Sequence, residues 1–167
     1  MQFDKKFAEK IFSMTKQSVG LSKLAIFGAT KLIWLLAISI LIWEISAKHL
    51  EKHSALALIL GIGVAWIFQL ASAYLLNRHR PFQQNHEKPL LQLMWRTPSF
   101  PSGHTTISCA MAAGVFAQDP VWGSIFFVLA ALIALSRIAV GVHYFSDIIG
   151  GAVLGIGVAT VVARLVL

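Results

Sequence analysis

The sequence predicts an all-α integral membrane bundle with about five transmembrane helices and an N-terminal amphipathic helix at the membrane interface. Of its 167 residues, 57% are hydrophobic and 13% are charged, and the mean hydropathy is +0.73. A typical soluble domain has about 45–50% apolar and about 25% charged residues. The apolar residues also fall in blocks close to the ~20 residues that cross a bilayer as a helix. This composition excludes a disordered chain, a collagen-like chain and a small disulfide scaffold.

The N-terminal segment, residues 1–23, is basic and amphipathic. Its apolar residues Phe3, Phe7, Ile11 and Met14 recur at helical spacing, and lysines lie between and after them. This pattern is typical of a helix that lies flat in the headgroup region of a membrane. We therefore predict an interfacial helix over 1–23 that contacts membrane lipids.

Apolar blocks follow this segment, and each is interpreted as one membrane helix. The predicted helices cover residues 24–47, 54–76, 105–117, 121–140 and 143–167. Lys31 and Glu44 lie toward the two ends of the first block, where long side chains can reach the interface. Gly151 and Gly155 predict close packing of the last helix against a neighbour. We expect all these helices to form a single domain over 1–167.

The long polar stretch between the second and third blocks, residues 77–104, cannot be one helix. It contains four prolines, at positions 81, 89, 98 and 101. We predict a catalytic loop here. An apolar patch within it, residues 90–95, is expected in the headgroup zone, and a loop lid without a substrate role is the alternative.

Three polar clusters stand out because an apolar bundle has no structural need for them. They are residues 80–81 (Arg-Pro), 101–104 (Pro-Ser-Gly-His) and 136–137 (Ser-Arg), the last followed by His143 and Asp147. Ionisable groups at membrane depth are costly and are functional candidates. An even number of predicted spans separates the first cluster from the third, and a helical hairpin returns the second and third to similar depth. We therefore expect all three to meet at one end of the bundle.

The spacing within these clusters indicates particular chemistry. His143 and Asp147 are four residues apart, which on a helix puts both on one face. A carboxylate that binds one imidazole nitrogen leaves the other free as a nucleophile or base, although a purely structural hydrogen bond would have the same spacing. Arg80 and Arg137 offer two permanent cations with a geometry that fits phosphate oxygens, and anchoring to lipid headgroups is the alternative.

The Pro-Ser-Gly-His run precedes a predicted helix. The Ser102 hydroxyl, the Gly103 amide and the positive end of the helix dipole can all point at an anion. A plain N-cap turn is the alternative, because serine caps helices well without any ligand. That alternative leaves His104 unexplained unless it handles protons.

These residues resemble the motifs of the type 2 phosphatidic acid phosphatase family, which shares its phosphate site with vanadium haloperoxidases and glucose-6-phosphatase. The resemblance spans about residues 77–151. It implies that His143 attacks phosphorus, that Asp147 orients it, and that His104 protonates the leaving oxygen and then activates water on a phosphohistidine. It implies further that the phosphoryl oxygens are held by Arg80, Arg137, Ser102 and the Gly103 amide. No metal or other cofactor is implied, since phosphoryl transfer depends mainly on positioning and positive charge.

One position departs from the family pattern. A lysine usually stands seven residues before the arginine of the first motif, and here that residue is Ala73. Either Arg78 or His79 substitutes for it, or the chain belongs to a branch without that lysine. The resemblance of Arg80-Pro81-Phe82 to bacterial undecaprenyl pyrophosphate phosphatases favours the second explanation and undecaprenyl pyrophosphate as the substrate.

Other functions stay open at this point. The substrate could be lipid A or phosphatidylglycerophosphate, the phosphoryl group could pass to another lipid instead of water, or the chain could bind a lipid phosphate without catalysis. The formal net charge of +7 fits anionic lipid or phosphate partners, and a membrane location disfavours nucleic acid. We expect a multi-pass protein of the plasma (inner) membrane with its active site on the outer, periplasmic face. The sequence leaves the oligomeric state open.

Overall fold

The computed structural model describes residues 2–46, 52–85, 87–92 and 97–167 of the chain. Within these ranges the regular structure is entirely helical, which confirms the predicted fold class. The helices are α1 (Gln2–Lys16), α2 (Val19–Thr30), α3 (Leu32–Ser46), α4 (Lys52–Leu76), α5 (Pro81–Asn85), α6 (Gly103–Gln118), α7 (Pro120–Ala139) and α8 (Phe145–Val166).

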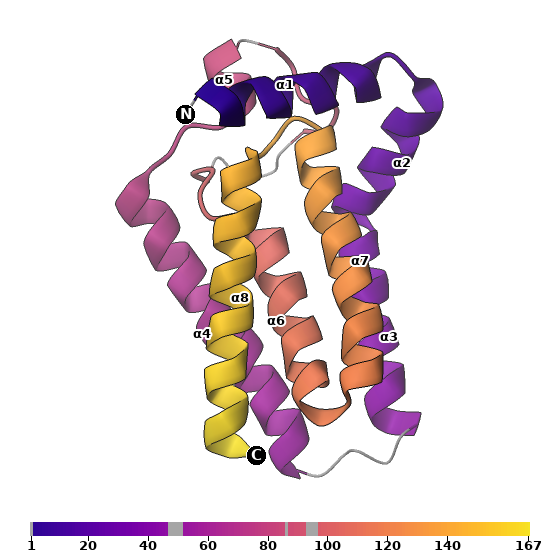
Figure 1. The fold of residues 1–167 in the computed structure, drawn as a ribbon, viewed down its shortest axis with the longest axis vertical. Coiled ribbons are helices and arrows are strands. Elements are labelled where there is room, and N and C mark those ends of the chain that lie inside the picture. Colours follow the sequence, from indigo (N-terminus) through magenta and orange to yellow (C-terminus); the bar gives the residue numbers. More distant parts are fainter. Residues whose placement is uncertain (1, 47–51, 86, 93–96) are drawn as a thin grey trace.

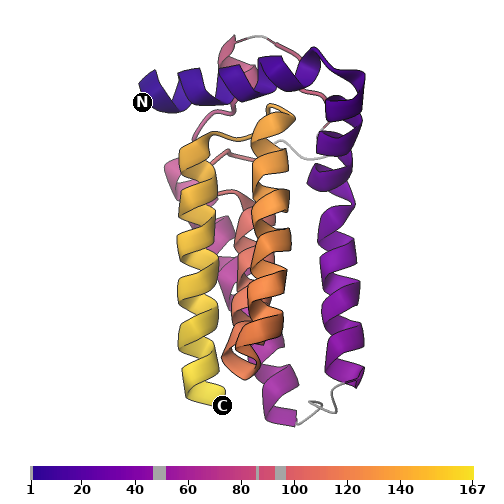
Figure 2. The same ribbon diagram turned by 45° about the vertical axis from the view of Figure 1, so that its right-hand side comes forward.

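The long helices run side by side along one axis, and α1 lies across one end of them, over the ends of α7 and α8 (Figures 1 and 2). The N-terminus is at that end, and the C-terminus is at the other (Figure 1). Helix α6 packs against α4, α7 and α8, and nearly all its buried residues are small, such as Ala110, Ala112 and Ala113. Small side chains allow neighbouring helices to approach closely.

Two predicted boundaries are wrong near the N-terminus. The interfacial helix was predicted over 1–23, but α1 ends at Lys16 and α2 begins at Val19. Ser18 is the N-cap of α2, and its hydroxyl accepts a hydrogen bond from the Leu21 amide at 3.4 Å. A capping serine starts a new helix axis, which a count of apolar positions does not detect.

The single helix predicted over 24–47 is also wrong, because α2 and α3 meet at Lys31 with a bend of 49°. The Thr30 hydroxyl donates to the Ile26 carbonyl at 2.7 Å, a type of contact that often bends helices. Hydropathy is continuous across the bend, so composition alone predicts one helix.

The number of membrane spans is not confirmed as five. Within the described residues, α4, α7 and α8 are long and apolar enough to cross a membrane, and α2 with α3 makes a fourth crossing if the bent pair counts as one. Helix α6 has only 16 residues. The last helix starts at Phe145 and not at residue 143, and the predicted loop 77–104 contains the short helix α5. Residues 93–95 of the predicted apolar patch lie outside the described residues.

Glycines bring α8 against α6 at the end of the bundle that holds α1. A Cβ on Gly155 would collide with the Thr106 carbonyl oxygen, and a Cβ on Gly151 would lie 2.8 Å from the Ser102 carbonyl oxygen. The close packing predicted for these two glycines is therefore confirmed. One turn further, the Ser102 amide donates to the Asp147 carbonyl at 3.0 Å, so the starts of α6 and α8 are joined directly.

Candidate active site

The three polar clusters meet at a cavity of about 630 Å³ between α2, α4 and α6. The functional side chains and backbone that line it include Arg80, Gly103, His104, Arg137 and His143. Arg80 and His143 come from loops, His104 from the first turn of α6, and Arg137 from the last turn of α7. The structure therefore places imidazole and guanidinium groups from separate segments around one space.

His143 lies in the loop before α8, so the prediction that it shares a helix face with Asp147 is wrong in that detail. Its Nδ1 lies 2.9 Å from the Ser99 carbonyl oxygen. Because a carbonyl only accepts, Nδ1 carries the proton and Nε2 keeps its lone pair. Nε2 lies 3.3 Å from Arg80 Nη1. Burial lowers the pKa of His143 to about 4, against a rise from the Asp147 hydrogen bond, so the ring is neutral at physiological pH.

Asp147 lies behind His143 and is completely buried. Its Oδ2 accepts hydrogen bonds from Ser99 Oγ and from the Tyr144 amide, the latter at 2.8 Å, and lies 3.4 Å from His143 Nδ1. Ser99 thus contacts both the imidazole and the carboxylate, and sequence reasoning missed it. It belongs to no motif or periodic pattern that could have identified it.

Arg80 is held by several oxygen atoms of the loops around it. Its Nε donates to the Thr97 carbonyl at 2.9 Å, its Nη2 to Thr97 Oγ1 at 2.9 Å, and its Nη1 to the Val142 carbonyl at 3.1 Å. Burial lowers its pKa to about 10, which still leaves the guanidinium charged at neutral pH. The arginine is therefore fixed in place before any ligand binds.

Arg137 is buried but has fewer partners. Its Nη1 donates to the Ala29 carbonyl, near the end of α2, at 2.8 Å. Its Nε has no hydrogen-bond partner among the described residues. A buried N–H without an acceptor costs about 1–3 kcal/mol, so an anion in the cavity would have a direct stabilising contact here.

At the start of α6, Gly103 and His104 line the cavity, whereas Ser102 is not among the lining residues. Ser102 is fully buried and is the N-cap of the helix, but its side chain makes no capping hydrogen bond. Its Oγ instead accepts a hydrogen bond from Thr105 Oγ1 at 3.0 Å, which disfavours the plain N-cap explanation. Gln69, which the sequence did not indicate, donates to the Pro101 carbonyl at 3.1 Å and lies against Gly103.

Arg78 does not line the cavity. Its Nη1 donates to Asp147 Oδ1 at 2.7 Å and its Nη2 to Asp4 Oδ2 at 2.7 Å. Neither of the predicted substitutes for the family lysine, Arg78 and His79, is brought to the cavity, whereas Ala73 at the lysine position does line it. The geometry thus gives Arg78 a different set of contacts from those of a phosphate ligand.

Metal ligands are a separate question. Within the part of the chain that the structure describes, no group of three His, Cys, Asp or Glu side chains is placed to hold a metal ion. Metal independence stays a prediction, which a chelator tests directly.

Comparison with known proteins places this geometry in a family. The family model described as PAP2 superfamily matches residues 54–167. The chain belongs to the PAP2 superfamily. This confirms the resemblance that the three motifs indicated, and the chain is accordingly a membrane phosphatase of that superfamily.

Two relatives of this PAP2 phosphatase carry the name undecaprenyl-diphosphatase. YbjG of Escherichia coli (strain K12), provisionally named undecaprenyl-diphosphatase, is 35% identical over 137 residues, which are 79% of this chain and 67% of YbjG. An undecaprenyl-diphosphatase of Sulfolobus acidocaldarius is 32% identical over 105 residues, 62% of this chain, and the match spans about half (51%) of that protein.

Solved structures show the same fold. The crystal structure of Aquifex aeolicus LpxE has a TM-score of 0.73 at 25% identity, covering 95% of this chain and 93% of LpxE. A PAP2-type phosphatidylglycerolphosphate phosphatase from Bacillus subtilis has a TM-score of 0.71 at 21% identity, covering 98% and 83%. At that identity the second likeness concerns the fold alone.

Proposed function

We propose that this PAP2 phosphatase removes phosphate from a membrane lipid phosphate or pyrophosphate through a phosphohistidine, with undecaprenyl pyrophosphate as its substrate. One observation carries the proposal: the cavity is lined both by the buried Arg80 and Arg137 and by a wall of large apolar side chains. Trp66, Leu70 and Tyr74 of α4 and Ile107 of α6 line its apolar part. Trp66 and Tyr74 are 51% and 67% exposed, so this wall continues onto the outer surface of α4. A phosphate would bind beside the arginines while an acyl or prenyl tail extends into lipid.

The first chemical step uses the lone pair on His143 Nε2. This nitrogen forms a bond to phosphorus while the bond from phosphorus to the leaving oxygen breaks, and His104 supplies the proton that the leaving oxygen takes. In the second step His104 removes a proton from water, the water oxygen attacks phosphorus, and the N–P bond breaks. Inorganic phosphate leaves, and both imidazoles return to their initial state.

The remaining groups stabilise charge on the three phosphoryl oxygens during both steps. These groups are the Arg80 and Arg137 guanidiniums, the Ser102 hydroxyl and the Gly103 amide at the start of α6. Fixed donors in a site with little water stabilise a transition state more than mobile donors do, because they need not reorganise. The multiple hydrogen bonds of Arg80 fit this requirement.

The choice of undecaprenyl pyrophosphate is supported by the names of the relatives from E. coli and S. acidocaldarius. Lipid A and phosphatidylglycerophosphate are the alternative substrates, and transfer to a second lipid is the alternative reaction. The deciding experiment measures phosphate release by purified protein from these three lipids, with EDTA present throughout. We expect release to be fastest with the pyrophosphate and to be unchanged by EDTA; loss of release with EDTA would contradict metal independence.

Two further arms test the mechanism. His143→Ala should lower phosphate release at least about a thousandfold, because it removes the nucleophile. His53→Ala, an exposed histidine in the first turn of α4, is the matched control and should retain full activity. A terminally ³²P-labelled substrate shows where the phosphoryl group goes: label in inorganic phosphate supports hydrolysis, and label in a second lipid supports transfer. Equal turnover by His143→Ala and wild type would exclude the phosphohistidine.

We also propose that the cavity faces the outer side of the plasma membrane. The single cysteine, Cys109, is buried, so introduced cysteines can be labelled selectively. Ser13→Cys, on α1, and Arg164→Cys, near the opposite end of the bundle, both replace exposed residues. An impermeant maleimide should label Ser13→Cys in intact cells and Arg164→Cys only after lysis; the reverse pattern would place the cavity on the cytoplasmic side.

A further inference from the structure

A chain of ion pairs connects α1 to the candidate active site. Asp4 of α1 pairs with Arg78, which lies just beyond the end of α4, and Arg78 pairs with Asp147 in the first turn of α8, both at 2.7 Å. Asp147 contacts His143 directly and through Ser99. These residues are separated by up to 143 positions in the sequence, so only the fold brings them together.

We propose that Asp4 is a positioning residue of this enzyme, which acts through Arg78 on Asp147 and so holds His143 ready to attack. The inference rests on the proposed function of His143. Asp4 and Arg78 do not touch the substrate in this arrangement. They set the position of the carboxylate that orients His143, and neither of them lines the cavity.

The contacts of Asp4 indicate a specific role and not a loose surface pair. Its Oδ1 accepts a hydrogen bond from the Ser146 amide at 3.0 Å, and its Oδ2 accepts from Ser146 Oγ at 2.5 Å. Burial alone would raise the pKa of Asp4, but hydrogen bonds from Ser146 and Arg78 lower it, so the carboxylate stays ionised. Asp4 is thus bound both to Arg78, which pairs with Asp147, and to Ser146, which precedes Asp147 in the chain.

Arg78 has little freedom to move between the two carboxylates. Its guanidinium carbon lies 4.3 Å from the centre of the Tyr144 ring, and Nη1 also donates to Ser146 Oγ at 2.5 Å. Removing the Asp4 charge would leave Asp147 as its one remaining carboxylate partner. The guanidinium would then shift toward Asp147 and change the alignment of that carboxylate with Ser99 and His143.

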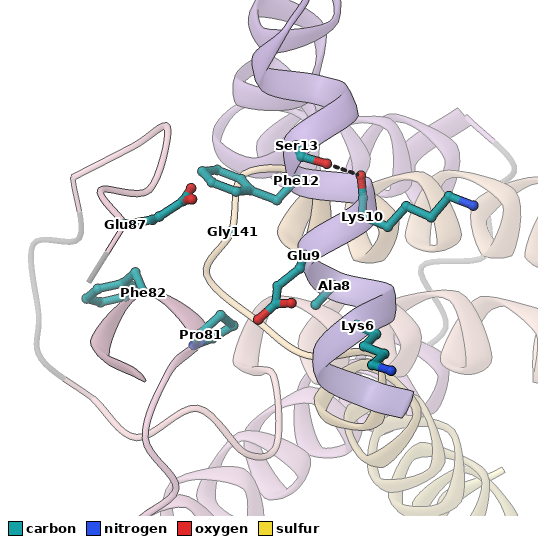
Figure 3. A pocket seen from close by; sticks show the side chains of 10 residues that line it. All are labelled: Lys6, Ala8, Glu9, Lys10, Phe12, Ser13, Pro81, Phe82, Glu87 and Gly141. Atoms are coloured by element: carbon teal, nitrogen blue, oxygen red, sulfur yellow. Dashed lines mark hydrogen bonds between the residues drawn. The ribbon is translucent and has the colours of Figure 1, made fainter. Parts of the chain in front are cut away.

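Helix α1 is seated on the loops that carry the site. Ala8 and Phe12 are buried, and a Cβ on Gly141, whose φ is +81°, would lie 2.8 Å from the Phe12 ring. Figure 3 shows Ala8, Glu9 and Phe12 on the side of α1 that faces Gly141 and the segment of Pro81 and Phe82. These residues line a cavity of about 570 Å³. The surface on which α1 packs is therefore next to Pro81 and Phe82, the two residues that follow Arg80.

The exposed side of α1 carries apolar and basic residues, as predicted for a helix that lies at the membrane surface. Phe3 and Met14 are 75% and 57% exposed on α1, a helix that carries four of the N-terminal lysines. Because Asp4 is on this helix, the position of α1 on lipid and the alignment of His143 are linked through Arg78.

The test compares Asp4→Asn with Glu87→Gln in the phosphate-release assay. Glu87 forms another ion pair with α1, to Lys16 at 3.6 Å, but both side chains are more than half exposed and do not reach Asp147. Asp4→Asn should lower kcat about three- to thirty-fold with KM changed less than about twofold. Asp4→Glu should restore most of the loss, and Glu87→Gln should leave kcat unchanged.

A double substitution tests whether Asp4 acts through Arg78. In an Arg78→Gln background, Asp4→Asn should lower kcat by less than about twofold more, because the intermediate group is already gone. Full additivity of the two losses would show that Asp4 acts by another route and would overturn the proposal.

A readout independent of turnover separates this inference from the proposed function. In ¹⁵N-histidine-labelled protein, the ring resonances of His143, assigned by their loss in His143→Ala, should shift in Asp4→Asn and stay in place in Glu87→Gln. If lipid phosphates are not hydrolysed but the resonances shift, the connection holds and the proposed function fails. If the wild-type protein hydrolyses lipid phosphates, but Asp4→Asn changes neither kcat nor the His143 resonances, the connection is wrong.

Discussion

The two sides of the cavity differ in how completely the protein satisfies their polar groups. On one side, Arg80 donates to Thr97 and Val142, and His143 and Asp147 are both bound to Ser99. On the other side, Arg137 donates to one carbonyl, that of Ala29, and its Nε has no partner in the described ranges. The first side is organised by hydrogen bonds within the protein, whereas the second has a buried donor without a partner among the described residues. Substitutions on the two sides should therefore differ in their effects on activity and on stability.

The largest expected effect is on the organised side. Asp147→Asn should lower kcat about a thousandfold, because an amide cannot accept from Ser99, Tyr144 and Arg78 at once and no longer stabilises a charged imidazole. Asp119→Asn is the matched control at the far end of the bundle, where Asp119 caps α7. Asparagine caps helices equally well, so this variant should keep its activity. Similar losses in both variants would indicate a general effect on folding.

The two arginines compare the sides directly. Arg137→Lys should lower kcat/KM about ten- to a hundredfold, because charge-assisted hydrogen bonds to phosphate are each worth about 1.5–3 kcal/mol. Its thermal midpoint should change little. Arg80→Lys should lose similar activity and also melt at a lower temperature, because lysine cannot bind both Thr97 and Val142. Melting temperatures can be measured by circular dichroism or with a dye that does not react with thiols. Equal melting temperatures of Arg137→Lys and Arg80→Lys would contradict the difference proposed between the two sides.

A smaller effect is expected at the start of α6. Ser102→Ala should lower kcat/KM about tenfold, the value of one hydrogen bond to a charged phosphate, about 1.5 kcal/mol. Ser108→Ala removes a buried hydroxyl from the same helix, where it donates to the Thr105 carbonyl at 3.2 Å, and serves as the control. If Ser102→Ala loses stability but no activity, the hydroxyl has a structural role only.

The smallest expected effect is that of mild acid on His143. Burial lowers its pKa to about 4, so between pH 6.5 and 5 the ring should stay neutral and nucleophilic. Over this interval an ordinary histidine, with a pKa near 6.5, would become charged. The unfolded chain then binds a proton that the folded chain does not, so stability should decline as the pH falls from about 6.5 toward 4. A titration of the His143 ring by ¹⁵N shifts checks this, and an inflection near pH 6.5 would contradict it.

Much of the site could be anticipated from local patterns. Among the residues that the structure describes, the runs at 80–81, 101–104 and 136–147 contain every charged side chain that lines the cavity. Residues such as Ser99, Gln69 and Asp4 could not be anticipated, because their roles depend on partners 32 to 142 positions away. Arg78 is a possible substitute for the family lysine by sequence for the same reason: its charge is visible in the sequence, but its two carboxylate partners are not.

The membrane class, the helical fold and the motifs that meet at the cavity followed from the sequence by itself, since hydropathy and motif spacing are properties of neighbouring residues. Only the tertiary structure decided where α1 ends, that the first span bends at Lys31, and that His143 lies outside the helix of Asp147. It also decided which buried polar atoms have hydrogen-bond partners and which, such as Arg137 Nε, have none among the described residues. Those outcomes depend on how separate helices pack. Side-chain contacts between distant segments produce no periodic pattern in the sequence, so the sequence alone does not predict them.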